Sequence, residues 1–77
     1  MKTEDEFWAE LNRECDARGL YPEVWQRRSK QWEGTLFFAD EARRGFPAPE
    51  YGSVIGTSCM AVIRGLIRAF ESGNGNE

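Results

Sequence analysis

Residues 32–38, Trp-Glu-Gly-Thr-Leu-Phe-Phe, decide which structure is predicted for the middle of the chain. Apolar side chains before, within and after this stretch recur at the spacing of one helical stripe. They are Trp25, Trp32, Leu36 and Ala39. The pattern predicts one long helix over residues 22–44, with two arginines in its last turn and a glycine after it.

Gly34 is the weak point of this predicted helix, because glycine inside a helix costs about 1 kcal/mol relative to alanine. One alternative is therefore a helix that breaks at Gly34. A second alternative is a short strand, since residues 35–38 are rich in side chains that favour strands.

The N-terminal segment has a complete set of helix signals over residues 3–18. Thr3 and Glu6 form the pattern of a capping box, and Gly19 stands where a left-handed C-cap is expected. The apolar face of this predicted helix consists of Phe7, Trp8, Leu11 and Cys15.

A third helix is predicted over residues 50–71, after the stiff connector Phe-Pro-Ala-Pro at residues 46–49. Its expected apolar face contains Ile55, Cys59, Val62, Ile63, Leu66 and Phe70. Residues 73–77 are polar and glycine-rich, and we expect a flexible tail there. The predicted fold is all-α, a compact three-helix bundle formed by one domain over residues 1–72.

The composition excludes several kinds of chemistry. The 77 residues include no histidine and carry a net charge of -3, so catalytic triads and His-ligated metal sites are ruled out. No motif indicates a reaction, a metal or a cofactor, and we expect a protein that is not an enzyme. Cys15 and Cys59 are expected to be free thiols, with a disulfide between them as the alternative.

The sequence also predicts a cytoplasmic protein. Its N-terminus is acidic, where a signal peptide would be basic and then apolar. The longest uncharged run, residues 51–63, is too short to cross a membrane.

Two surfaces are candidates for binding a partner protein. On a continuous second helix, Phe37 and Phe38 would lie away from the core stripe, with Arg27, Lys30 and Arg44 around them. Aromatic residues with a charged rim are typical of interaction hot spots. The alternative is that both phenylalanines are buried in the core.

The second candidate surface is acidic. Residues 1–16 carry six acidic and two basic side chains, and Glu6, Glu10 and Glu14 form a column along the first helix. Such a column could occupy a basic groove on a nucleic-acid-binding protein, or could simply be a solvated helix face. Arg27, Arg28 and Lys30 form a basic cluster that could contact phosphate.

Small residues in the third predicted helix suggest a different contact. Ser53, Thr57, Ala61 and Gly65 recur every four residues and would make a low ridge where another helix can approach closely. This ridge is either the seam of a homodimer or a site of internal packing.

In size, charge segregation, excess aromatic residues and absence of catalytic residues, the chain resembles the small acidic inhibitors made by phages and mobile elements, including anti-CRISPR proteins. The resemblance implies a non-enzymatic protein-binding module, a steric inhibitor of a larger partner such as a nucleic-acid-binding complex. The alternatives are a structural or regulatory homodimer packed through the third helix and a small DNA-binding regulator.

Overall fold

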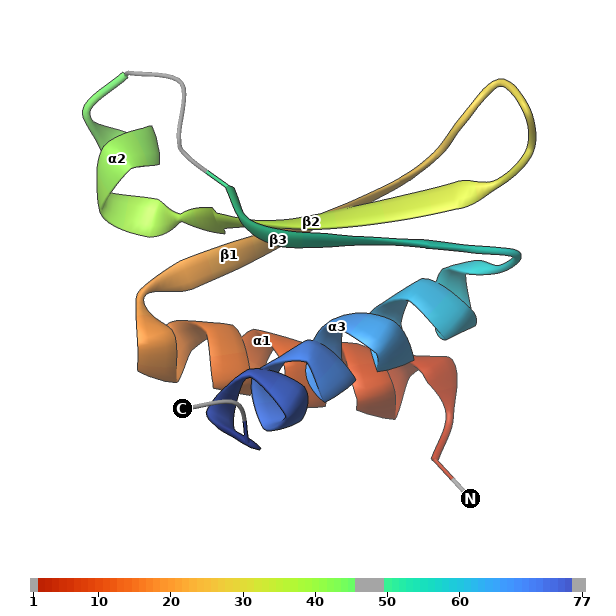
Figure 1. Ribbon diagram of the computed structural model, residues 1–77, viewed down its shortest axis with the longest axis horizontal. Helices are drawn as coiled ribbons and strands as arrows, with labels where there is room; N and C mark the ends of the chain where they lie inside the picture. Colours follow the sequence, from red (N-terminus) through yellow and green to blue (C-terminus); the bar gives the residue numbers. More distant parts are fainter. Residues whose placement is uncertain (1, 46–49, 76–77) are drawn as a thin grey trace.

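A computed structural model describes residues 2–45 and 50–75, with side chains described as far as Glu71. Its elements are α1 (Glu4–Arg18), β1 (Leu20–Gln26), β2 (Trp32–Phe38), α2 (Ala39–Arg43), β3 (Glu50–Gly56) and α3 (Cys59–Gly75). The strands form one antiparallel sheet in the order β1-β2-β3, and α1 and α3 lie side by side against one face of it (Figure 1). The prediction of an all-α three-helix bundle is therefore wrong, and the fold is α+β.

The predicted second helix is instead a β-hairpin followed by the short helix α2. β1 pairs with β2 from Leu20↔Phe38 to Gln26↔Trp32. The turn is closed by the Arg27 amide, which donates to the Gln31 carbonyl at 2.7 Å, and by the Lys30 amide, which donates to the Arg27 carbonyl at 2.9 Å. Both strands begin before Gly34, so neither a continuous helix nor a helix broken at Gly34 forms.

Packing against α3 explains why residues 32–38 form a strand. Gly34 and Leu36 are buried on the side of the sheet that faces the helices. A Cβ atom at Gly34 would lie 2.5 Å from Val62 Cγ1 and 2.9 Å from Leu66 Cδ1. The missing side chain thus lets α3 pack directly on the backbone of β2.

The predicted third helix begins nine residues later than expected, because its first part forms β3. The β-branched pair Val54 and Ile55 lies in this strand, which is consistent with strand propensity. The hydroxyl of Ser58 accepts a hydrogen bond from the Ala61 amide at 3.1 Å and so caps the start of α3. From Cys59 onward the predicted helical face is confirmed, since Val62, Ile63, Leu66 and Phe70 are buried.

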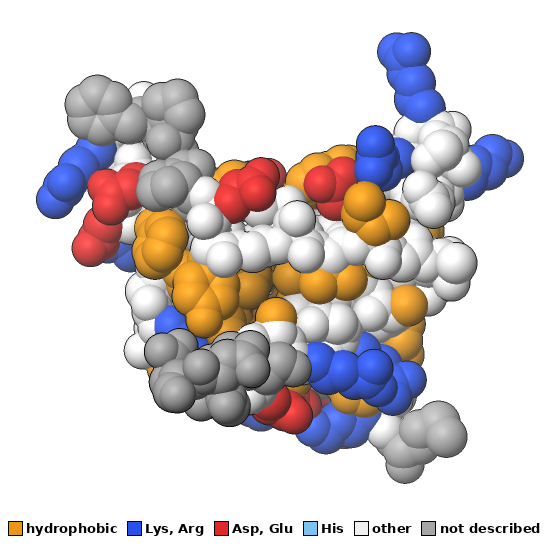
Figure 2. Space-filling view, viewed as in Figure 1, with side chains coloured by type: hydrophobic (Ala, Val, Ile, Leu, Met, Phe, Trp, Pro, Cys, Tyr) orange, Lys and Arg blue, Asp and Glu red, His pale blue; other side chains and the backbone are white. Residues whose placement is uncertain are grey.

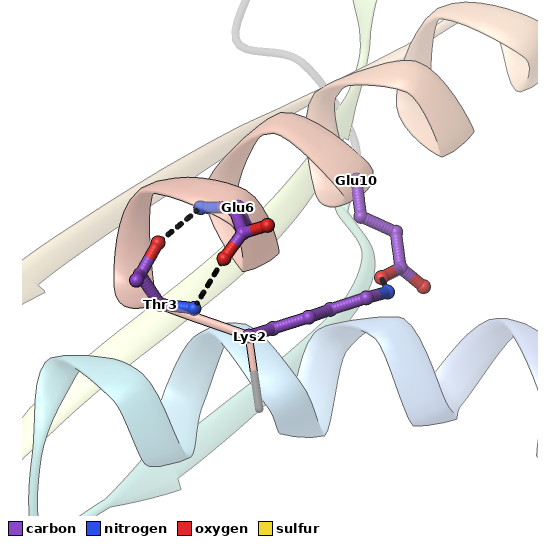
Figure 3. A network of polar contacts seen from close by, with 4 residues as sticks. All are labelled: Lys2, Thr3, Glu6 and Glu10. Carbon is purple, nitrogen blue, oxygen red and sulfur yellow. Dashed lines mark hydrogen bonds and ion pairs between the residues drawn. The ribbon is translucent and has the colours of Figure 1, made fainter.

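The first predicted helix is confirmed in its span and in both caps. The Thr3 hydroxyl accepts from the Glu6 amide, and the Glu6 carboxylate accepts from the Thr3 amide at 2.8 Å (Figure 3). Gly19 adopts φ 70°, the left-handed conformation that ends α1.

The core lies between the helices and one face of the sheet. Its buried apolar residues are Leu11, Cys15, Leu20, Leu36, Val62, Ile63, Leu66, Ile67 and Phe70. Two residues predicted for the core are exposed instead, Trp25 at 38% and Ile55 at 52%. The connector at 46–49 lies outside the described residues. The predicted tail at 73–77 overlaps α3, which continues to Gly75, and residues 76–77 also lie outside the described part.

Candidate protein-binding surface

Within residues 2–45 and 50–75, one face of the sheet carries no helix. Because Gly34 and Leu36 face α1 and α3, strand alternation places Glu33, Thr35 and Phe37 on the opposite face. The strand register then defines this surface, which we call the open face. It consists of Tyr21, Glu23, Trp25, Glu33, Thr35, Phe37, Glu50, Ser53 and Ile55. In Figure 1 the open face is the upper side of the sheet, between α2 and the hairpin turn.

The open face carries four large apolar or aromatic side chains, Tyr21, Trp25, Phe37 and Ile55, among five polar or acidic ones. Tyr21 and Phe37 are cross-strand partners whose rings stack, with centroids 5.3 Å apart and planes at 26°. Trp25 and Ile55 lie on either side of Glu33, in the row nearer the hairpin turn. Thr35, in the central strand, is only 1% exposed. A solvated antiparallel face normally carries polar residues at positions such as those of Trp25 and Ile55.

Carboxylates are interspersed with these apolar side chains. Glu23 and Glu50 are exposed and form no ion pair within the described part of the chain. Glu33 is half-buried, and its Oε1 lies 3.7 Å from Nη1 of Arg27. The open face therefore combines aromatic anchors with negative charge.

The structure separates the two phenylalanines that were predicted to form one patch. Phe37 is half-buried on the open face. Phe38 points to the helical side, where its ring meets Tyr51 edge-on at 6.1 Å. Successive strand residues point to opposite faces, so the predicted Phe37–Phe38 patch does not exist.

The predicted basic rim is divided between the two ends of the sheet. Arg27 and Lys30 lie in the hairpin turn together with Arg28, whereas Arg44 follows α2 and pairs with Glu41. Figure 2 shows Lys and Arg side chains over both ends. The cluster of Arg27, Arg28 and Lys30 is thus brought together, but Arg44 is not part of it.

The predicted acidic column lies on α1, but its members have local partners. Glu6 is engaged in the capping box, Glu10 pairs with Lys2, and Glu14 pairs with Arg18 (Figure 3 for the first two). The backbone and side-chain hydrogen bonds from Thr3 lower the pKa of Glu6. Glu10 and Glu14 are thus each paired with a cation, whereas Glu6 stays ionised and its carboxylate is engaged in the helix cap.

The predicted ridge of small residues is not one helical surface. Ser53 lies on the open face and Thr57 precedes α3, so only Ala61 and Gly65 are on the helix. A Cβ atom at Gly65 would lie 2.7 Å from Val54 Cγ1. The close packing of α3 against β3 therefore explains why residue 65 is a glycine, with no second copy of the chain required.

Tyr21, Trp25 and Ile55 were not predicted to belong to an exposed surface, but all three lie on the open face. Alternation was the signal that could have found two of them, because Tyr21, Glu23 and Trp25 occupy every second position of β1. That signal was hidden by Trp25, Trp32 and Leu36, which also fit a helical stripe.

The described residues contain no group of three or more His, Cys, Asp or Glu side chains that could hold a metal ion. Both cysteines are free thiols. Burial raises the pKa of the Cys15 thiol to about 11, and burial together with the charge of Glu4 raises that of Cys59. Within the same residues, no helix has the length and apolar character needed to cross a membrane.

Comparison of the chain with protein families, curated proteins and solved structures gives no match.

Proposed function

We propose that this protein is a non-catalytic binding module whose open face docks onto a partner protein. The observation that carries the proposal is the stacked pair Tyr21–Phe37, together with Trp25, on a sheet face that no helix of the described residues covers. Large aromatic side chains lose little conformational entropy on binding and dominate interface energetics. The exposure of Trp25, 38% of its surface, is a cost in a chain this small that a binding role explains.

The charge of the open face indicates the chemistry of the partner. Glu23 and Glu50 complement basic side chains, and the aromatic residues complement apolar ones. A surface with both is typical of proteins that bind nucleic acid, where aromatic residues stack on bases and basic residues contact phosphates. The proposed mechanism is steric: the open face covers such a surface and blocks it, as a phage-type inhibitor in the cytoplasm would.

The experiment is stoichiometric co-purification with a double variant of the exposed anchors, Trp25→Ser with Ile55→Ser. We expect the variant to stay folded and to lose the partner that the wild type retains. Tyr51→Ser is the matched control, because Tyr51 is similarly exposed but lies on the helical side against Phe38 and Phe70. The proposal is wrong if the folded double variant retains the partner, or if Tyr51→Ser loses it equally.

A homodimer is the second candidate, and the outer edge of β3 favours it. β3 is an edge strand with no charged residue from Tyr51 to Gly56 and no proline, whereas β1, at the other edge, contains Pro22 and Glu23. Unprotected edge strands pair readily with a second chain. Sedimentation that gives twice 8.8 kDa, and returns to 8.8 kDa in Ile55→Lys, would support this candidate.

A further inference from the structure

A groove of about 360 Å³ lies between α1 and α3 and is lined by no residue of the open face. Lys2, which precedes α1, and the α1 residues Phe7 and Glu10 line one side of it. The α3 residues Arg64, Ile67, Arg68 and Glu71 line the other. Its size is at the lower end of the range for sites that bind small molecules.

Cationic groups gather around one aromatic ring in this α1–α3 groove. Nζ of Lys2 and Cζ of Arg64 each lie 5.5 Å from the centroid of the Phe7 ring. Arg68 is one helical turn after Arg64 on the same wall. Figure 2 shows Lys and Arg side chains gathered on the helical side, below the sheet.

The two arginines of the groove differ from most other arginines of the chain. Arg64 and Arg68 form no ion pair with any carboxylate in the part of the chain whose side chains are described. Lys2, by contrast, is already paired with Glu10 (Figure 3). The arginines that do have carboxylate partners are Arg18, Arg27, Arg43 and Arg44.

We propose that the α1–α3 groove binds a small organic phosphate. The phosphate contacts the guanidinium groups of Arg64 and Arg68, which present planar sets of donors suited to its oxygens. The apolar part of the ligand, an aromatic ring, packs against Phe7 and Ile67. Three cations and two carboxylates line the groove, and this small positive excess favours a compact anion over a long polyanion.

The experiment uses ¹⁵N-labelled full-length protein and follows the arginine Nε–Hε signals by NMR at constant ionic strength and pH 7. Adenosine 5′-monophosphate, inorganic phosphate and adenosine are added separately. We expect saturable shifts of Arg64 and Arg68 with the nucleotide, at least tenfold weaker binding of inorganic phosphate, and none of adenosine. The comparison separates recognition of the phosphate from recognition of the ring.

Arg64→Gln with Arg68→Gln should abolish saturable nucleotide binding. Arg13→Gln with Arg28→Gln is the matched control and should retain it, because these exposed arginines do not line the groove. Glu71→Gln is a second test that removes a carboxylate from the lining and should tighten nucleotide binding severalfold.

Several results would overturn the proposal. They are the absence of saturable shifts, equal shifts of all exposed arginines, and equal affinity for inorganic phosphate and the nucleotide. Undiminished binding by the Arg64→Gln, Arg68→Gln variant, or weaker binding by Glu71→Gln, would overturn it as well.

Discussion

Gly34 shows how the same residue has opposite effects in two folds. In a helix over residues 22–44 it would be a defect that alanine repairs. In the sheet it is required, because α3 approaches β2 so closely that Val62 and Leu66 occupy the space of a side chain. The effect of one methyl group on stability therefore distinguishes the two structures.

We predict that Gly34→Ala destabilises the protein by about 1–3 kcal/mol, the usual cost of overpacking a well-packed core. A helix would instead gain about 1 kcal/mol from the same change. Urea unfolding measures the difference. Gly52→Ala is the matched control in β3, where a Cβ atom would meet nothing within 4 Å, and it should change stability much less.

At the scale of elements, α1 is fixed by contacts between residues close together in the sequence, whereas the β1–β2 hairpin is not. The capping box and the Gly19 cap of α1 use partners within four residues. The hairpin turn over residues 27–31 contains neither glycine nor proline, and Lys30 adopts φ 72° where Gly or Asn is usual. The turn therefore carries no sequence signature that would reveal the two strands.

The capping box of α1 gives a prediction at this scale. Thr3→Ala should cost about 1 kcal/mol of unfolding free energy, because the amide of Glu6 loses its acceptor. Thr57→Ala makes the same chemical change at an exposed residue outside any helix or strand and should cost far less. Equal costs in thermal or urea unfolding would show that the box does not stabilise α1.

At the scale of the whole molecule, a single core between two helices and one sheet face supports the entire fold. A chain of this size buries a modest fraction of its surface, and no helix within the described residues covers the open face. Titration of a buried core group should consequently affect global unfolding, and Cys15 is such a group because it is 1% exposed.

We predict that the protein loses stability between pH 9 and pH 11 through Cys15. Its folded-state pKa of about 11 lies above the ordinary value of 9.0, so the unfolded chain releases its proton first as the pH rises. The stability is fully present below pH 9 and is lost as the pH passes through the folded pKa. Urea unfolding at pH 7.5 and 10.5 should show a loss larger by about 2 kcal/mol in wild type than in Cys15→Ala. A parallel loss in both proteins would contradict the assignment.

The candidate surface was predicted only in part. Phe37 belongs to the open face and Arg27 pairs with an acidic member of it, but Phe38 points to the other side of the sheet. Tyr21, Trp25 and Ile55 were not predicted, because only the pairing of all three strands brings them onto one surface. Their common surface exists only once β1 and β3 lie on either side of β2.

By itself, the sequence determined α1, with both caps, and the apolar face of α3 from Cys59 onward, because those signals are local and repeat at helical spacing. Tertiary structure decided the strands. Trp32 and Leu36 fit a helical stripe and also an alternating strand, and the choice depends on distant partners: Val62 and Leu66 above Gly34, and paired strands on both sides. A strand is stabilised by hydrogen bonds to other segments, whereas a helix satisfies most of its own, so periodicity alone could not identify the sheet or its open face.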